Sequence, residues 1–297
     1  MCGIVGKIAE QAFSIQDVIV LLKRLEYRGY DSVGIATPDG TVMKEVGQID
    51  EFLATLPDKR TTVAISHTRW ATHGKVTKTN AHPHASPSGR VTIVHNGIIE
   101  NYLSLKAELK EKGCTFVSET DSEVIAIFFD DALSHGLDMH AAIESFFEKA
   151  HGTFAILLLR KGDDTLYAMK RDSPLVAGML PDGYVIASDI YAFSDATTEA
   201  LFFEDEEYAF VTPSSCTFFS AGTPIRKEVT QVSWTGTVAI GDVYPHYMIK
   251  EIHEQPDAAL RLIESLSHGQ HKRMAAFADM AKRASRVLLV AAGPSYH

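Results

Sequence analysis

A cysteine directly follows the initiating methionine, and this position allows an unusual chemistry. If Met1 is removed, Cys2 carries a thiol and a free α-amino group on the same residue. That amine has a reference pKa near 8, so near pH 7–8 it is substantially neutral and can act as the base for the thiol, directly or through a water. Most cysteines at the second position are accidents of sequence, so position alone permits a nucleophile without identifying one.

Thirteen histidines raise the question of a metal site, and the pair His82 and His84 is the most suggestive. Ligands at alternate positions, with no cysteine or carboxylate cluster in register, are weak indications of a metal. For His67, His84 and His95 we expect local hydrogen bonds in strands and turns. We therefore predict no metal and no cofactor. The cysteines, Cys2, Cys114 and Cys216, are too few and odd in number for a disulfide framework.

The elements that must position these residues mix two periodicities over the first 150 residues. Apolar residues at helical spacing predict a helix over 17–25 that ends before Gly29, and another around 103–109 that ends at Gly113. Residues 62–66 and 91–95 have the composition of short strands. Thr120 and Glu123 form a capping-box signature, which predicts a helix that begins near residue 121 and ends near Gly136.

Short strands linked by turns dominate residues 153–233. Their apolar runs are 154–159, 166–169, 184–187, 207–211 and 217–220, with a turn at 162–164 between the first two. Helices together with many turn-linked strands indicate α+β layers rather than a regular alternation of strand and helix.

The character of the sequence changes after residue 233. Residues 235–247 have the glycines and proline of a linker, 248–284 are helical in composition, and 286–292 resemble a buried parallel strand. Gly293, Pro294 and Ser295 then occupy the place where an α/β domain opens a phosphate-binding turn. A domain cannot finish on its first strand, so we expect the chain to be part of a longer protein.

The bulk properties exclude several classes of protein. The chain has 297 residues, of which 45% are hydrophobic, and a formal net charge of -10. Its length suits one large domain and part of a second. The acidic balance argues against a nucleic-acid or membrane-surface partner. No apolar run reaches the roughly 18 residues needed to span a bilayer, and the first residues have no charged region followed by a long apolar core, so they are not a signal peptide. We expect a soluble cytoplasmic protein.

Six segments in order resemble the class II glutamine amidotransferases. They are MCGIVG (1–6), LEYRGYDS (25–32), HTRWATHG (67–74), NAHPH (80–84), HNGIIEN (95–101) and SETDSE (118–123). The resemblance covers essentially the whole chain and is strongest over residues 2–123. Within the family it is nearest to the members that transfer ammonia to D-fructose 6-phosphate. It implies that Cys2 is the nucleophile and that L-glutamine is the substrate.

The resemblance also assigns roles to the ends of the substrate. Arg69 would bind the α-carboxylate of glutamine, because its guanidinium is a fixed, always-charged fork. Out of context, Arg69 would be read as a surface residue paired with a carboxylate. Asp121 would bind the α-ammonium group, and it could also help to cap the helix expected near residue 121.

Asn96 and Gly97 resemble the family's oxyanion hole, whose donors stabilise charge that develops on the amide oxygen. Following the strand expected over 91–95, the same Asn-Gly pair could be an ordinary turn. The resemblance further implies that Thr72, His73 and His82 line the substrate pocket. Arg28 would help to order the site, and Trp70 would pack beside it.

The implied architecture has two parts. Residues 2–233 would form a four-layer αββα N-terminal-nucleophile hydrolase sandwich, 234–247 a linker, and 248–297 the start of an α/β sugar-isomerase (SIS) domain. Ser295 matches a residue of the family that binds sugar phosphate. The family usually has Cys-Gly-Thr-Ser-Tyr in this turn, whereas residues 292–296 are Ala-Gly-Pro-Ser-Tyr. Pro294 lacks a hydroxyl and an N–H donor, which puts phosphate binding in doubt. The full-length family members imply a homodimer.

Three alternatives remain at this point. An amidotransferase of the amidophosphoribosyl type would share the first domain, but the isomerase-like strand at 286–292 argues against it. A non-catalytic glutamine-sensing module would not need Cys2. A papain-like Cys–His–Asn protease would stay active with extra residues ahead of Cys2, whereas an N-terminal nucleophile would not.

Overall fold

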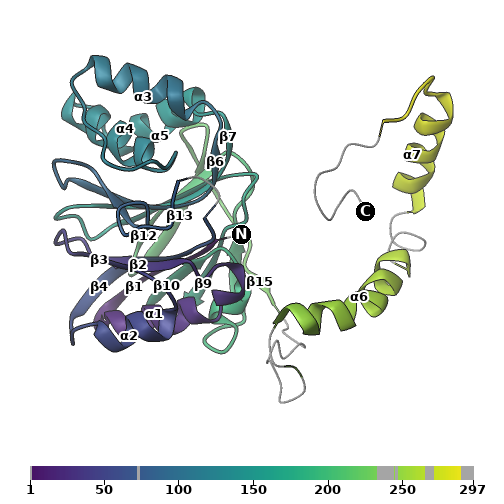
Figure 1. Cartoon of the computed structure of the whole chain (residues 1–297), viewed down its shortest axis with the longest axis horizontal. Coiled ribbons are helices and arrows are strands. Elements are labelled where there is room, and N and C mark those ends of the chain that lie inside the picture. Colours follow the sequence, from purple (N-terminus) through teal and green to yellow (C-terminus); the bar gives the residue numbers. More distant parts are fainter. Residues whose placement is uncertain (1, 72–73, 233–243, 245–246, 265–270, 289–297) are drawn as a thin grey trace. The chain divides into compact units, whose positions relative to one another are not determined.

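The chain divides into two compact units, Met1–Thr235 and Gly236–His297. The computed structural model describes residues 2–71, 74–232, 244, 247–264 and 271–288. In the first unit two antiparallel sheets stack face to face and helices cover the outer face of each (Figure 1). The four-layer αββα arrangement is therefore confirmed.

The larger sheet contains the start of the chain. Its strands lie in the order β15 (Thr230–Gln231), β11 (Glu199–Phe202), β9 (Val176–Leu180), β10 (Gly183–Ala187), β1 (Gly3–Ser14), β4 (Arg60–Arg69), β2 (Ser32–Ala36) and β3 (Val42–Val46). Helices α1 (Ile15–Lys23) and α2 (Ile49–Thr55) cover its outer face, with the 3-10 helices η1 (Glu26–Arg28) and η2 (Ile190–Phe193) nearby. The helix predicted over 17–25 is thus found two residues earlier, because Ser14 caps it with a capping box completed by Asp17.

The second sheet has the order β14 (Thr223–Ile225), β13 (Ser215–Ser220), β12 (Glu207–Thr212), β8 (Leu166–Arg171), β7 (Gly152–Arg160), β6 (Val91–Ile99) and β5 (His84–Ala85). Its outer face packs on α3 (Tyr102–Glu111), α4 (Glu123–Ser134) and α5 (Met139–Lys149). All of the strands predicted at 62–66, 91–95, 154–159, 166–169, 184–187, 207–211 and 217–220 are present, and each is longer than expected.

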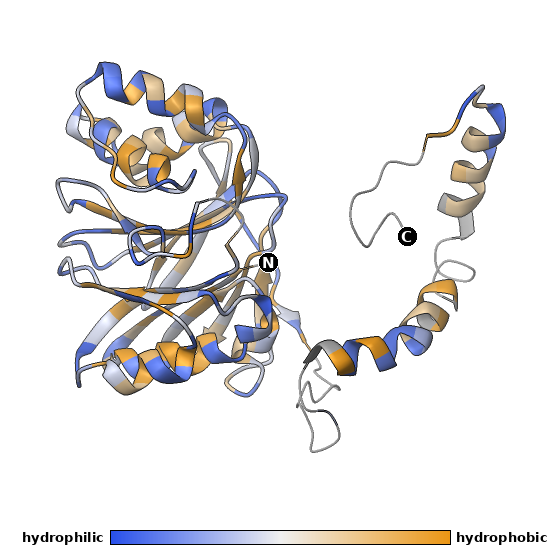
Figure 2. Cartoon of the chain, viewed as in Figure 1, coloured by the Kyte–Doolittle hydropathy of each residue, from blue (hydrophilic) through white to orange (hydrophobic). Residues whose placement is uncertain are grey.

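Three apolar clusters hold the layers together. Two lie between a sheet and the helices that cover it, and the third lies between the two sheets. The middle cluster contains residues such as Ile4, Val94 and Leu157, which are fully buried. Hydrophobic stretches run along the strands of both sheets (Figure 2). Burial of these apolar side chains is the main contribution to stability, and it fixes the two sheets against each other. Both sheets contribute residues to the site described below.

The start of α4 differs from the prediction. The helix begins at Glu123, and its N-cap residue Ser122 makes no side-chain capping bond. The Glu123 carboxylate instead accepts hydrogen bonds at 2.8 Å from the backbone N–H groups of Val117 and Ser118. The Thr120–Glu123 capping box is therefore wrong: Glu123 bonds the preceding loop instead of capping its own helix. Residues 120–122 of this loop line the pocket described below.

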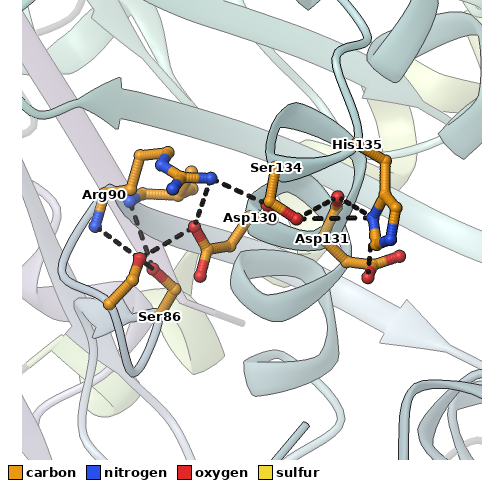
Figure 3. Close-up of polar contacts among 8 residues, drawn as sticks. Ser86, Arg90, Asp130, Asp131, Ser134 and His135 are labelled. Carbon is orange, nitrogen blue, oxygen red and sulfur yellow. Dashed lines mark hydrogen bonds and ion pairs between the residues drawn. The ribbon is translucent and has the colours of Figure 1, made fainter. Parts of the chain in front are cut away.

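Surface polar contacts tie α4 to the turn between β5 and β6 (Figure 3). The guanidinium of Arg90 lies 3.4 Å from the Asp130 carboxylate, and the Ser88 hydroxyl donates to the same carboxylate at 2.8 Å. One turn further along α4, His135 contacts Asp131 at 3.3 Å. Such surface contacts contribute little individually; those of Asp130 connect the helix to the sheet edge, whereas that of His135 lies within the end of the helix.

The second unit contains α6 (Tyr247–Glu264) and α7 (His271–Arg283), which agrees with the helical composition of 248–284. Most of the expected linker, the turn at 293–295 and residues 289–292 of the expected strand lie outside the described residues. Residues 286–288 are described and form no strand. None of the helices in the described ranges has the length and hydrophobicity that crossing a membrane requires.

Candidate active site

Cys2 lies immediately before β1, at a point where the two sheets meet. Its Sγ accepts a hydrogen bond from the backbone N–H of Trp70 at 3.2 Å. Its carbonyl oxygen accepts hydrogen bonds from Nδ2 of Asn96 at 2.9 Å and from Nε of Arg28 at 3.2 Å. Cys2 is therefore held by the end of β4, by β6 and by η1, which come from three separate parts of the sequence.

Burial governs the acidity of the Cys2 thiol. Desolvation raises the pKa of the thiol above its usual value, although the Trp70 N–H and the charges of Arg69 and Arg28 oppose that shift. A thiol with a raised pKa is protonated at neutral pH. Because the thiolate is the nucleophilic form, reaction at this position requires a base.

Two buried residues of opposite charge lie beside the thiol. Arg69 ends β4 with 4% of its surface exposed, and Asp121 is 5% exposed in the loop before α4. The Arg69 Nη1 donates to the carbonyl of Lys75 at 3.4 Å, and one Asp121 oxygen accepts from the backbone N–H of Ile99 at 2.8 Å. The second expectation for Asp121, a role in capping a helix near 121, is wrong, because its carboxylate is bonded to β6.

One pocket collects these groups. Two pockets elsewhere are larger, but neither is lined by Cys2, so the chemistry rather than the size identifies the site. The residues around the pocket are Cys2, Arg69, Trp70, His82, His95, Gly97, Thr120, Asp121 and Ser122.

Asn96 and Gly97 do not follow the strand as expected; they lie inside β6. They pair with Ala155 and Phe154 of β7, so the reading of this pair as an ordinary turn is wrong. Gly97 has φ +124°, and a Cβ there would lie 2.0 Å from the carbonyl oxygen of Thr153. Only glycine fits this conformation and this close approach. The strand therefore places the Asn96 amide against Cys2 with a backbone that tolerates no side chain at the next residue.

Arg28 holds the backbone of Cys2 in place. It is 8% exposed, and its Nη1 lies 3.1 Å from Asp189, in addition to the bond from its Nε to the Cys2 carbonyl. The Tyr27 hydroxyl donates to the same carboxylate at 3.0 Å. Burial, together with the charge of Asp189, raises the pKa of Tyr27 to about 12, so the hydroxyl keeps its proton. This geometry is compatible with the ordering role expected of Arg28.

Trp70 contacts the site mainly through its backbone. Its side chain is 43% exposed, and its ring meets that of Tyr30 edge-on with centroids 5.5 Å apart. Its N–H bonds the Cys2 sulfur, and the carbonyl of Trp70 lies 3.6 Å from the same sulfur. Thr72, His73 and Ser295 lie outside the described residues.

Four buried histidines are packed together at the pocket, and two of them, His82 and His95, line it. The ring centroid of His82 lies 4.0 Å from that of His67, 4.7 Å from that of His84 and 6.4 Å from that of His95. Burial lowers the pKa of His67 to about 3 and also lowers the pKa values of the other three histidines. All four are therefore neutral at physiological pH. Among the described residues, no group of three or more histidine, cysteine or carboxylate side chains is placed so that it could hold a metal ion.

The hydrogen bonds of these histidines are not local, contrary to expectation. His67 Nε2 contacts the carbonyl oxygen of His95 at 3.0 Å, and His84 Nε2 contacts the Thr120 hydroxyl at 3.2 Å. His95 Nδ1 lies 2.9 Å from the Ser122 hydroxyl. The pocket residues His95, Thr120 and Ser122 were missed as site residues, because the sequence suggested a strand and a helix start for them and carries no signal of this cross-layer contact.

Comparison with known proteins shows what the region that contains most of these residues is similar to. A family model described as a glutamine amidotransferase domain matches residues 67–195. The chain is 38% identical over 305 residues to the glutamine–fructose-6-phosphate aminotransferase [isomerizing] of Thermococcus kodakarensis, and 40% identical over 309 residues to the protein of the same name from Listeria innocua. Each alignment covers 100% of this chain and 50% of the relative, so the chain spans about half the length of these curated relatives.

A solved structure supports the same fold. The glutamine phosphoribosylpyrophosphate amidotransferase from B. subtilis superposes with a TM-score of 0.63 at 25% sequence identity. The match covers 74% of this chain and 49% of that protein. The shared part has the size of the four-layer unit described above.

Proposed function

We propose that this chain carries a class II glutamine amidotransferase domain, and that the domain hydrolyses L-glutamine to glutamate and ammonia with Cys2 as an N-terminal nucleophile. One observation carries the proposal: a single small pocket brings together the Cys2 thiol, a buried cation, Arg69, and a buried anion, Asp121. Glutamine needs this set, because it has a zwitterionic end to be held and an amide to be attacked.

Recognition of the zwitterionic end falls to the two buried charges. Arg69 binds the α-carboxylate and Asp121 the α-ammonium group. Both residues are removed from water, so their interactions with a bound ligand are stronger than those of exposed charges. His82 lines the pocket in its neutral form, and Thr72 and His73 complete the lining in this proposal.

Catalysis begins with transfer of the thiol proton. After Met1 is removed, the α-amine of Cys2 takes the proton from its own thiol, and the sulfur attacks the side-chain carbonyl carbon of glutamine. The tetrahedral intermediate collapses, the C–N bond breaks, and ammonia leaves with the proton returned by the amine. Water then hydrolyses the γ-glutamyl thioester and regenerates the thiol.

The oxyanion of the intermediate is stabilised by β6. Nδ2 of Asn96 donates one hydrogen to the Cys2 carbonyl and has a second N–H to offer. The backbone N–H of Gly97 is the other donor in this proposal. One such donor contributes about 3–4 kcal/mol to the stability of a transition state of this kind.

The activity of the whole protein is a further part of the proposal. The relatives' names support transfer of the ammonia to D-fructose 6-phosphate, which gives D-glucosamine 6-phosphate. We further propose that the whole protein is a cytoplasmic homodimer. Residues 2–233 are then the glutaminase domain, 234–247 a linker and 248–297 the start of the sugar-isomerase domain, with Ser295 toward the sugar phosphate. The net charge of -10 supports the absence of nucleic-acid and membrane partners.

The first experiment combines intact mass and activity on one sample. We expect a mass that lacks Met1, release of glutamate from glutamine, and no release by Cys2→Ala. A second variant, with one alanine inserted between Met1 and Cys2, keeps the thiol but moves the free amine to another residue. We expect this variant to be inactive as well.

Each result separates two readings. Activity in the insertion variant would show that the base is a separate group and not the N-terminal amine, as in a papain-like enzyme. Absence of hydrolysis by the wild-type chain with Met1 removed would favour a glutamine-binding module. Binding of glutamine by Cys2→Ala, measured by calorimetry and lost in Cys2→Ala combined with Arg69→Met, would locate the substrate at this pocket.

A further inference from the structure

Residues 74–83 lead into β5 of the second sheet, and His82 among them lines the pocket. Lys44, on β3 at the edge of the larger sheet, meets this segment. Its ammonium group donates hydrogen bonds to three backbone carbonyls of the segment, those of Thr79 at 3.3 Å, Ala81 at 2.7 Å and Pro83 at 3.1 Å. One side chain thus uses all three of its N–H groups on backbone that flanks His82.

The cross-strand partner of Lys44 is Gly34 on β2. A Cβ at Gly34 would lie 2.2 Å from the carbonyl oxygen of His82, which real Cβ atoms do not approach so closely. The carbonyl of His82 therefore packs directly against the backbone of β2 at Gly34, while Lys44 donates to the carbonyls of the residues before and after His82. Together Gly34 and Lys44 form a cradle for residues 81–83.

The Lys44 ammonium is partly buried here, although a charged group is more stable in water. Burial lowers the pKa of Lys44 to about 8, an effect that Glu123 of α4 opposes and that Arg69 of β4 and Lys78 of the segment reinforce. His84, which also faces Lys44, is neutral. Between pH 8 and the ordinary lysine pKa the unfolded chain binds a proton that the folded chain does not, so the charged form costs stability at neutral pH.

We propose that the Gly34–Lys44 pair is a positioning device that sets the His82 wall of the glutamine pocket, an inference that rests on the proposed function. Neither residue lines the pocket. Displacement of the wall changes how well glutamine is bound before reaction, while Cys2, Asn96 and Gly97 stay in place on their strands. The expected signature is a change in KM with little change in kcat.

The test compares Lys44→Met and Lys44→Arg with a matched control, Lys78→Met. Lys78 joins the same segment to the same strand through an exposed ion pair with Glu45 at 2.8 Å, so it reports what a surface contact contributes there. We expect Lys44→Met to raise the KM for glutamine about 10-fold or more with kcat within about twofold. Lys44→Arg is expected to restore most of the affinity, since guanidinium is also a multiple donor, and Lys78→Met should match the wild type.

A pH profile adds a readout that a merely structural lysine would not affect. As pH rises through about 8, Lys44 loses a proton and one of its three donors, so the wild-type KM should rise more steeply than that of Lys44→Arg, which stays charged. The ammonium of glutamine itself titrates equally in both proteins, so their difference reports Lys44. Gly34→Ala, which keeps Lys44 but pushes on the His82 carbonyl, should raise KM in the same way.

The outcomes distinguish the two levels of the argument. If the wild type and Lys78→Met hydrolyse glutamine and Lys44→Met has an unchanged KM, the cradle is overturned and the proposed function stands. If Lys44→Met does not fold, the pH profiles of the wild type and Lys44→Arg decide, and superimposable profiles overturn the cradle. If the wild type releases no glutamate, both the proposed role of the cradle and the proposed function are rejected.

Discussion

The two walls of the pocket are built by different means. The strand wall consists of Arg69 on β4 and Asn96 and Gly97 on β6, whose backbones are fixed by ladders in the two sheets. The segment wall consists of His82 and residues 120–122, which lie in the largely irregular stretches 74–83 and 118–122. Side chains replace the ladder there: Asn80 bonds both the carbonyl of Lys75 and the carboxylate of Glu119.

The difference suggests a division of labour. Groups proposed to act on the reacting amide lie on the strand wall, where the backbone cannot shift without breaking several ladder bonds. The segment wall carries groups that bind or enclose the ligand without reacting, Asp121 and His82 among them, and a few polar contacts set their position. A rigid scaffold for chemistry and an adjustable wall for recognition is a common distribution in enzymes.

Damage to the strand wall should have the largest effect. In Gly97→Ala the new Cβ would meet the Thr153 carbonyl oxygen at 2.0 Å in a backbone conformation with φ +124°, so β6 must move. We expect at least about a 100-fold loss of kcat, the scale seen when an oxyanion donor is removed. Gly89→Ala is the control, because φ there is +70° but no atom lies within 4 Å. It should cost about 1 kcal/mol of stability and leave kcat unchanged; equal loss of kcat in both variants would contradict the assignment.

The histidines between the walls predict a pH dependence of stability. Their pKa values are lowered in the folded protein, so below about pH 6.5 the unfolded chain binds protons that the folded chain does not. Stability is therefore lost as pH falls. Each such histidine contributes a slope of up to about 1.4 kcal/mol per pH unit. Urea unfolding at pH 7 and pH 5.5 should show a smaller loss in His84→Gln than in wild type.

An exposed histidine provides the matched control for that experiment. The side chain of His135 is 67% exposed at the end of α4. Its replacement by glutamine should leave the pH slope of the wild type. If His84→Gln and His135→Gln have the same slope, the buried cluster is not what makes the protein sensitive to acid.

A single contact within the segment wall should have the smallest effect. Asn80→Ala removes the bonds to Lys75 and Glu119 but leaves those made by Lys44. We expect KM for glutamine to rise about three- to tenfold, which corresponds to about 1 kcal/mol, the usual net value of a hydrogen bond. Initial-rate kinetics measure it. A fall in kcat with unchanged KM would mean that this wall takes part in the chemical step.

The sequence predicted elements of the strand wall better than those of the segment wall. The strands at 62–66 and 91–95 were recognisable because apolar β-formers follow one another, although the second strand continues through Asn96 and Gly97. The Asn-Gly pair has the local signature of a turn, and only pairing with β7 reveals a strand. The Thr120–Glu123 pattern failed for a related reason, since Glu123 bonds the preceding loop instead of capping its own helix.

The residues of the site were predicted through their motif context, and their contacts were not. Nothing local indicates that Glu119 bonds Asn80, or that Lys44 reaches three carbonyls around His82, because these contacts join residues distant in sequence. Alternation of apolar and polar residues identifies layers, whereas side-chain bonds across layers depend on the packed structure.

The position of β1 in its sheet has a consequence for how the protein is made. Val5 pairs with Ser66 on one side and with Ala187 on the other. A ribosome adds roughly 5–20 residues per second, so the strand next to the nucleophile waits about 10–40 s for its second neighbour. Trimming of the initiator methionine, on which the proposed chemistry depends, thus has an interval before the sheet closes around the new amino terminus. The order of translation and the order of assembly together give the processing enzyme its opportunity.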